Sequence, residues 1–312
     1  MKDTPIGWCH HTINFWMGCD HVSKECEGCY AREMMEGYGE NFGVLRLTQG
    51  PWLEAELLNA RAKTRNEYEL VFTCSMSDFF HSQADPWRSE AWDVIRRCRN
   101  LIWLILTKRP ERICENLPSD WDEGRTFPHV WLGTTCGVRR SFKRVDELRS
   151  IPCSLRFLSC EPLIEDIRSI NLNGIGWILC GGMSGKCSKK YPMKMTWASS
   201  LHSLAREHGV PFLFKQISDM KPESGINALG LFLAHVHRKP LPAAPFDCER
   251  EYPELPGFPI RPPEIRGLRL SEAEWGKYCK KQNINLWLPP GTVENPLAPS
   301  VCVPDDSAVI PD

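Results

Sequence analysis

The chain has 312 residues, of which 42% are hydrophobic, and this is enough for one large domain or two ordinary ones with packed cores. Its 38 basic and 39 acidic residues give a net charge of -1, so the strongly basic balance of non-specific nucleic-acid binders is excluded. Any such binding must come from a local patch. The most apolar run, Leu101–Leu106, is far shorter than the roughly 18 residues that span a bilayer. With no signal-peptide-like start either, we expect an intracellular protein without a membrane partner.

The first distinctive segment is GCDHVSKECEGCYARE, residues 18–33, in which Cys19, Cys26 and Cys29 follow a C-x6-C-x2-C spacing. In an intracellular chain with 15 cysteines, reduced thiols, metal ligands or small buried side chains are expected rather than disulfides. Three thiolates on one loop can hold three irons of a 4Fe-4S cluster and leave the fourth iron open to a small molecule. The alternative is a structural zinc site, which needs a fourth ligand. The nearby candidates for that ligand are His10, His11 and His21.

Six short apolar runs follow, and each has the composition of a strand buried on both faces of a parallel sheet. They are Glu69–Ser75, Leu101–Lys108, His129–Thr135, Ser154–Glu161, Gly176–Gly182 and Pro211–Gln216. Amphipathic stretches that begin at Pro86, Val138 and Met195 lie between them and predict helices. This alternation predicts an α/β fold: a partial or complete (β/α) barrel with mostly parallel strands. A doubly wound open sheet is the alternative, because spacing does not reveal strand order.

The composition changes at Pro240, and residues 240–312 hold 14 of the 25 prolines. We therefore expect two parts: residues 1–239 as the barrel domain with its N-terminal cysteine motif, and residues 240–312 as a Pro-rich, partly irregular extension. Within the extension, Ser271–Lys281 predicts one short helix, and the final PDDSAVIPD is expected to be disordered.

Polar or reactive side chains stand at the end of each predicted strand. Because active sites of barrels gather at the carboxyl ends of the strands, this pattern predicts a site there. Loop starts are polar in any protein, so a single residue of this kind carries little weight, but the pattern over six strands favours a site. The residues are Cys74, Ser75 and Asp78; Thr107, Lys108 and Arg109; Thr134, Thr135 and Cys136; Ser159, Cys160 and Glu161; Gly181, Gly182 and Ser184; and Lys215 and Gln216.

Three cysteines that end in C-x2-C-aromatic, on a loop before a βα barrel, resemble the radical S-adenosylmethionine superfamily, whose usual spacing is C-x3-C-x2-C. More closely, the chain resembles a family of phage and prophage proteins, the gp thirty-seven/gp sixty-eight family. The matching segments cover most of residues 7–216. They are GCDHVSKECEGCYA, VFTCSMSDFFH, LILTKRPER, VWLGTT, LRFLSCEPL, WILCGGMSG and GVPFLFKQ.

The resemblance implies that Cys19, Cys26 and Cys29 ligate a 4Fe-4S cluster whose open iron binds S-adenosylmethionine. It further implies a 5'-deoxyadenosyl radical that acts on an unknown substrate, for which a nucleotide or a nucleic acid is the candidate. An electron donor is then a required partner, and the cytoplasm of a bacterium or of a phage-infected host is the expected location. The alternative function is a zinc-stapled barrel that binds phage DNA or a phage protein without catalysis. Radical repair of damaged DNA is a third hypothesis, supported by the shared chemistry alone.

The same resemblance assigns roles at the strand ends. Glu161 would contact a ribose or move a proton, Lys108 would bind a carboxylate or phosphate, and a thiol would donate a hydrogen atom to a product radical. The expected catalytic residues are Lys108, Cys136, Cys160 and Glu161. The expected cofactor-binding residues are Ser75, Asp78, Gly181, Gly182, Ser184 and Lys215. Structural alternatives stay open: a tight loop for the glycines, a local hydrogen bond for Asp78 and core packing for the thiols.

Overall fold

The computed structural model describes residues 3–218, 221–222, 224–236, 251–254, 258, 260, 262–263, 268–281 and 283–284. The C-terminal segment for which we expect disorder lies outside the described residues, as does most of the Pro-rich extension. The extension's predicted helix is confirmed as α7, Glu272–Lys281. Among the helices of the described residues, none combines the length and apolar character needed to cross a bilayer.

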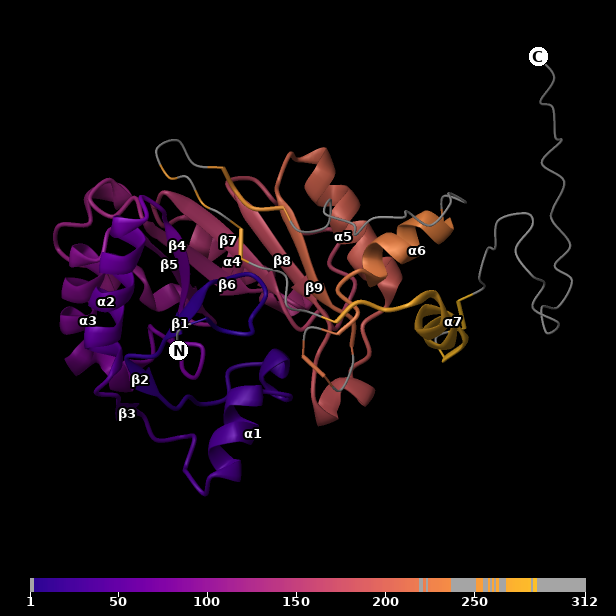
Figure 1. Cartoon of the computed structure of the whole chain (residues 1–312), viewed down its shortest axis with the longest axis horizontal. Coiled ribbons are helices and arrows are strands. Elements are labelled where there is room, and N and C mark those ends of the chain that lie inside the picture. The colour runs from indigo at the N-terminus through magenta and orange to yellow at the C-terminus, as the bar shows by residue number, and fades with distance from the viewer. Residues whose placement is uncertain are drawn as a thin grey trace, which may run out of the picture.

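One parallel sheet of seven strands forms the frame of the molecule (Figure 1). Its strand order is β1-β4-β5-β6-β7-β8-β9, so every strand pairs with the next sheet strand along the chain. Such a sheet has no point at which the strand order reverses, and the doubly wound alternative is therefore wrong. The sheet curls into a half-barrel, as the α/β prediction allows. The strands are β1 (His11–Ile13), β4 (Glu69–Thr73), β5 (Leu101–Thr107), β6 (Val130–Thr135), β7 (Leu155–Cys160), β8 (Trp177–Gly181) and β9 (Phe212–Gln216).

Strand β1 was not predicted, because the three residues HTI are too short to show a periodic pattern. It pairs with β4 in register His11↔Val71 and forms one edge of the sheet. The cysteine segment consequently follows the first strand of the sheet instead of preceding the whole barrel. A separate antiparallel pair, β2 (Trp16–Met17) with β3 (Arg46–Leu47), flanks that segment.

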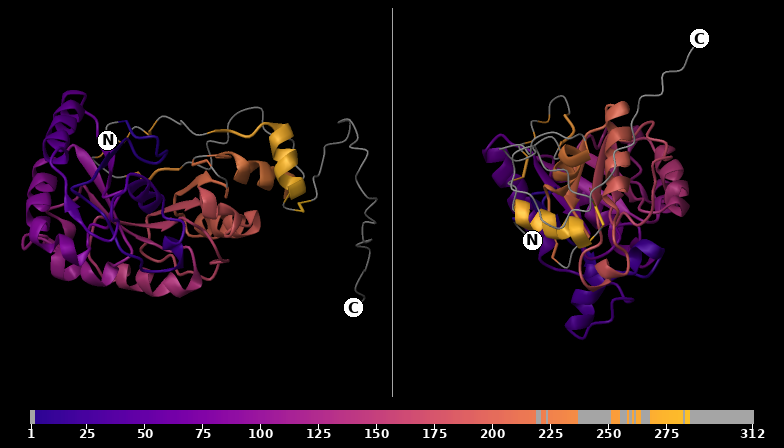
Figure 2. Two further views of the ribbon diagram at one scale, coloured as in Figure 1. Left: turned by 90° about the horizontal axis from the view of Figure 1, so that it is seen from below. Right: turned by 90° about the vertical axis from the view of Figure 1, so that its right-hand side faces the viewer.

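Helices cover the outer side of the curved sheet (Figure 2). The three helices predicted between strands are confirmed as α3 (Asp85–Arg97), α4 (Phe142–Arg149) and α5 (Met195–Glu207). Helix α5 ends just before Gly209, whose φ of +63° suits a glycine. The remaining helices are α1 (Tyr30–Gly37), α2 (Pro51–Thr64) and α6 (Ala228–Val236), of which α2 and α6 were not predicted.

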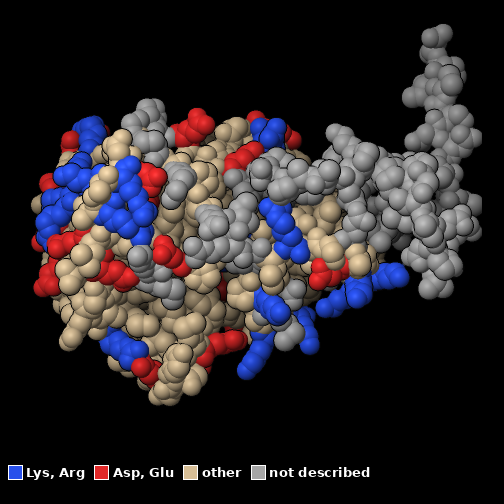
Figure 3. Space-filling model, viewed as in Figure 1, with Lys and Arg blue, Asp and Glu red and all other residues tan. Residues whose placement is uncertain are grey.

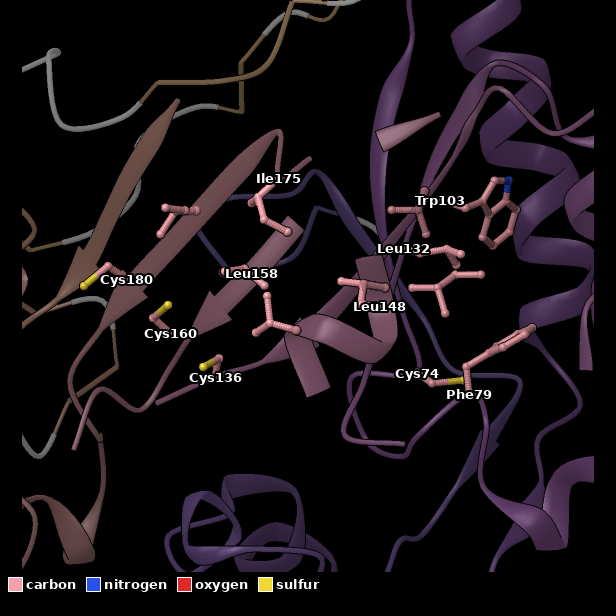
Figure 4. Close-up of a cluster of buried hydrophobic side chains, with 14 of the residues drawn as sticks. Cys74, Phe79, Trp103, Leu132, Cys136, Leu148, Leu158, Cys160, Ile175 and Cys180 are labelled. Carbon is pink, nitrogen blue, oxygen red and sulfur yellow. The ribbon is translucent and has the colours of Figure 1, made fainter. Parts of the chain in front are cut away.

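Alternate residues of each strand face these helices and form a core with them, called here the helix-side core. On the strands it includes Leu132, Leu158 and Ile178, which are fully buried, and on the helices it includes Trp92 and Leu148. Figure 4 shows Leu132, Leu148 and Leu158 in this layer. The other residues of each strand face the opposite, concave side.

The concave side holds a second core, called here the inner core, which is rich in aromatic side chains. Trp131 and Trp177 meet edge to face with ring centroids 6.0 Å apart, and Phe157 packs beside them. Gly133 makes room for Phe157, because a Cβ at that glycine would lie 2.4 Å from the ring. From the extension, Tyr252 packs on Trp177 at 5.4 Å. Aromatic and aliphatic packing thus fills the inner face along the central strands, and several polar side chains follow at their carboxyl ends.

Candidate functional site

Residues 18–30, called here the cysteine loop, lie across the carboxyl ends of the strands. At the end of β4, the Tyr30 hydroxyl donates a hydrogen bond to the carbonyl oxygen of Ser75 at 2.6 Å. After β5, Nη1 of Arg109 lies 3.7 Å from the Cys19 sulfur, and its Nη2 bonds the Asp20 carboxylate. The cysteine loop is therefore attached to the sheet at the carboxyl ends of β4 and β5.

The buried carboxylate of Glu25 attaches the cysteine loop to the segment after β6. Its Oε1 accepts hydrogen bonds from the Ser141 hydroxyl and from the Gly137 amide, and it lies 3.3 Å from Nη1 of Arg144. Burial alone would raise the pKa of Glu25, but the hydrogen bonds from Ser141 and Ser23 and the charge of Arg144 lower that pKa below its ordinary value. The carboxylate is therefore ionised at neutral pH and holds the loop by charge.

A third attachment joins the loop to the segment after β8. A Cβ on Gly28 would lie 2.5 Å from the sulfur of Met183 and 3.0 Å from Cβ of Cys187, so a side chain there would have to displace Met183. The Cys187 thiol donates to the carbonyl of Glu27 at 3.7 Å, and Nζ of Lys190 lies 3.0 Å from the Glu27 carboxylate. The cysteine loop thus contacts the segments that follow β4, β5, β6 and β8.

The three cysteines are partly buried in this loop. Cys19 and Cys29 pack against one small hydrophobic cluster that includes Met35 and Met76, and the Cys29 amide donates to the Cys26 carbonyl at 3.3 Å. Burial, and then the charge of Asp78, raise the pKa of the Cys19 thiol to about 11. Among the described residues, no group of three or more His, Cys, Asp or Glu side chains lies close enough together to hold a metal ion.

Beneath the loop, the concave side of the sheet ends in a layer of polar residues. Strand alternation places Thr135, Ser159, Glu161 and Lys215 above the aromatic inner core, since the residues two positions before them face that side. Oε1 of Glu161 lies 3.4 Å from Nζ of Lys215, and the two side chains are 13% and 19% exposed. The predicted residues Glu161 and Lys215 are therefore brought together as a half-buried ion pair.

Two oxygens of this polar layer lack hydrogen bonds from the described residues. The hydroxyl of Thr135 is fully buried without such a partner, and Oε1 of Glu161 has none apart from its ion pair with Lys215. Buried polar atoms are nearly always hydrogen-bonded in proteins, so these two oxygens at the ends of neighbouring strands call for a partner such as a water molecule or a ligand. Their position supports the prediction that the chemistry lies at this edge.

Asp78 and Ser75, predicted to contact the cofactor, are engaged in the protein itself. The Asp78 carboxylate is buried and accepts hydrogen bonds from the Thr107 hydroxyl at 2.7 Å and from Nη1 of Arg109 at 3.1 Å. It also accepts the backbone amides of Phe80 and Lys108. The Ser75 hydroxyl bonds the side-chain amide of Asn14 at 3.2 Å. These contacts favour a structural role for both residues, although most of the partners of Asp78 are distant in the chain and the expected local pairing of its side chain with His81 is not among them.

The glycine pair after β8 is explained by close packing. A Cβ at Gly182 would lie 2.3 Å from the amide nitrogen of Ser218, and one at Gly181 would lie 3.0 Å from Oε1 of Glu161. The Gly182 amide also donates to the Gln216 carbonyl at 2.9 Å. Ser184 is partly buried in the segment that follows. These contacts explain Gly181 and Gly182 without any ligand, although Gly181 borders the polar layer.

Cys136 and Cys160, the predicted hydrogen-atom donors, lie in the helix-side core (Figure 4). They form a row with Cys180 at the ends of three neighbouring strands, with Cys160 in register with Cys180. All three are fully buried, and burial raises the pKa of Cys136 to about 12 and that of Cys160 well above the ordinary value for a thiol. The structure thus places them on the side opposite Glu161 and Lys215, where core packing accounts for them.

Lys108, predicted as catalytic, contributes its backbone amide to Asp78, and its side chain is partly exposed beside the site. Sequence reasoning missed Glu25 and Arg144, which fix the cysteine loop. Nothing in the sequence distinguished Glu25 from the other charges of the motif, because its burial depends on a partner 119 positions away.

The fold and the site define an α/β protein with a parallel half-barrel sheet and a three-cysteine loop across the carboxyl ends of its strands. The chain belongs to the DUF5131 family, described as proteins of unknown function, which matches residues 3–281. No curated protein matches the chain. No solved structure matches it either.

Proposed function

We propose that the protein is a radical S-adenosylmethionine-type enzyme that carries a 4Fe-4S cluster on Cys19, Cys26 and Cys29. The observation that carries this proposal is the position of the cysteine loop over the polar ends of the parallel strands. The loop lies at the same carboxyl-terminal edge of the sheet as Glu161 and Lys215, the ion pair at the end of the inner face. The resemblances of the sequence to the radical S-adenosylmethionine superfamily and to a family of phage proteins agree with this arrangement.

The chemical type of the ligands fits the group, but the three thiols are not gathered around one point among the described residues, so binding of a cluster would have to draw them together. Three thiols within eleven residues match the soft ligands that iron-sulfur clusters take, and two of them, Cys19 and Cys29, already pack against the same hydrophobic cluster. The thiol of Cys19 must lose its proton to act as a ligand, so loading of the cluster releases protons. Three cysteine ligands would leave one iron of a 4Fe-4S cluster open to a small molecule.

When bound, such a cluster supplies the electron that cleaves S-adenosylmethionine to a 5'-deoxyadenosyl radical. The residues of this chain position and shield that chemistry. Glu25 and Tyr30 fix the cysteine loop on the sheet, and the aromatic inner core beneath the polar layer keeps water away from the strand ends. Glu161 and Lys215 offer one negative and one positive group to a bound molecule. The proposal requires an electron donor and a reducing cytoplasm, in a bacterium or a phage-infected host.

The test uses protein purified without oxygen. We expect a brown protein with about four irons and four sulfides per chain, and 5'-deoxyadenosine on addition of dithionite and S-adenosylmethionine. Alanine at Cys19, Cys26 and Cys29 together should abolish both iron binding and product. Cys114→Ala is the matched control, because Cys114 is an exposed cysteine outside the loop. A colourless parent protein that forms no product would refute the proposal.

One observation favours the second candidate, a zinc-stapled binding module without turnover. Cys187, from the segment after β8, donates its thiol hydrogen to the Glu27 carbonyl inside the cysteine loop, which brings a further thiol into contact with that loop. Four thiolates would close a tetrahedral zinc site and leave no open position. On this candidate, Cys187→Ala removes one zinc per chain. On the iron-sulfur proposal, the same variant keeps its iron, so metal analysis of this single substitution separates the two.

A further inference from the structure

The segment between β8 and α5, residues 182–194, carries four lysines and no acidic residue, in a chain whose net charge is -1. It is called here the lysine segment. It is the same segment that contacts the cysteine loop through Met183 and Cys187, so its charges stand beside the proposed active site. Figure 3 shows basic side chains on this lower side of the molecule, below β8 and β9.

The local geometry aligns two of these charges. Lys186–Lys189 form a 3-10 helix, in which residues three apart project from the same side. Lys186 and Lys189 are both exposed, whereas Ser188 between them is buried. The two ammonium groups therefore point away from the molecule together.

Not every lysine of the segment is available to a ligand. Lys190 is neutralised by Glu27, with Nζ 3.0 Å from the carboxylate. Lys186, Lys189 and Lys194 are exposed, and none of them forms an ion pair with a residue that the structure describes. Nζ of Lys194 lies 5.3 Å from the ring centroid of Trp197, so an aromatic face accompanies the charge. Proteins bind single-stranded nucleic acids through basic side chains that contact phosphates and aromatic rings that stack on bases.

We propose that the lysine segment binds the phosphate backbone of a single-stranded nucleic acid and guides it to the strand ends beside the cysteine loop. The inference rests on the proposed function for the identity of the neighbouring site and names the substrate class of that site. The total charge of the molecule is close to zero and does not attract nucleic acid, so electrostatic binding of a strand needs a local basic patch of this kind.

The test measures binding of a fluorescent single-stranded oligodeoxynucleotide, and of an oligoribonucleotide of the same sequence, to the full chain at several salt concentrations. For single strands, each phosphate contact adds about 0.7 to the magnitude of the slope of log K against log salt. Lys186→Ala with Lys189→Ala should therefore reduce that magnitude by about 1.4 and weaken binding of every sequence alike. Lys63→Ala is the control, because it removes one exposed lysine from the end of α2, away from the lysine segment.

The inference is overturned if neither oligonucleotide binds at low salt. It is also overturned if the slope of log K against log salt is the same for the double variant as for the parent protein. Because binding is measured without reductant or S-adenosylmethionine, the result is independent of turnover. Formation of 5'-deoxyadenosine by a protein that binds no strand leaves the proposed function standing and removes this inference. Strand binding by a protein that forms no 5'-deoxyadenosine removes the proposed function and leaves the binding of a single strand by the lysine segment standing.

Discussion

Oε1 of Glu25 lies 3.3 Å from Nη1 of Arg144, and this contact joins the cysteine loop to helix α4. The Glu25 side chain is fully buried and that of Arg144 is 12% exposed. Breaking such a buried charge pair by removing one partner is strongly destabilising, because the other charge stays buried without compensation. The attachment of the cysteine loop therefore depends on Glu25, a residue of the motif that is not one of its cysteines.

Glu25→Ala should lower the free energy of unfolding by about 3 kcal/mol, because Arg144 then loses its partner in a buried site. Urea unfolding measures the loss, and hydrogen exchange should show the amides of residues 18–30 exchanging faster. Glu27→Ala is the control in the same loop, and its effect should be much smaller because the Glu27 carboxylate is exposed to solvent. Equal losses from the two variants would contradict the anchoring role.

A second buried carboxylate, Glu69, should make stability depend on pH. Burial alone would raise the pKa of Glu69, but hydrogen bonds from His11 and Arg61 lower it to about 2, from 4.5 for an ordinary glutamate. A group with a lowered pKa in the folded state stabilises the protein above its unfolded pKa, and this stability is lost as the pH falls from about 4.5 towards 2. The full contribution at neutral pH is on the order of 3 kcal/mol.

Urea unfolding of the parent protein and of Glu69→Gln between pH 7 and a pH of about 3.5 checks this prediction. The gap between the two free energies of unfolding should be widest at neutral pH and should narrow below about pH 4.5. A gap that stays constant over this range would show that ionisation of Glu69 is not the cause.

Cys136→Ala and Cys160→Ala should each reduce stability by about 1 kcal/mol, because each removes one buried sulfur from the helix-side core. Turnover by the folded variants should remain at the parent level, since both thiols lie on the side away from Glu161 and Lys215. Assays of 5'-deoxyadenosine and thermal unfolding of the same samples check the two statements. A variant that keeps its stability but loses product would restore the hydrogen-donor role that the sequence suggested.

Much of the fold could be predicted because buried parallel strands are continuous apolar runs, and six of the seven strands of the sheet show that signal. Strand β1 shows none, since its three residues are held by pairing with β4 and not by their own pattern. Helix α2 was missed for a related reason: two leucines, Leu53 and Leu57, face solvent, so its apolar residues do not lie on one side.

The candidate site was predictable as a set of strand ends but not residue by residue. Successive residues of a strand face opposite sides of the sheet, so only one of two neighbouring polar residues faces the concave side. The sequence alone does not show which of the two it is. Glu161 and Cys160 are adjacent in the chain, yet Glu161 meets Lys215 while Cys160 lies among helix-side residues. The contacts of Glu25 and Asp78 were invisible for a different reason, because their partners are distant in the chain.

The ion pair of Glu161 with Lys215 yields the last prediction, which follows from the proposed function. Glu161→Gln leaves the half-buried ammonium group of Lys215 without its neighbouring charge, so we expect the rate of 5'-deoxyadenosine formation to fall at least about tenfold. The iron content should not change, because neither residue belongs to the cysteine loop. Glu207→Gln is the control, since Glu207 is an exposed carboxylate at the end of α5, outside the cysteine loop.

The double variant Glu161→Gln with Lys215→Met sharpens this test. If the two charges act as a unit on the bound molecule, the double variant should lose no more activity than the less active of the two single variants. The reason is that the effects of substitutions at residues in contact do not add. Additive losses would show that each side chain acts by itself. Activity of Glu161→Gln within about twofold of the parent, at equal iron content, would remove the pair from the active site and leave it as a structural contact between β7 and β9.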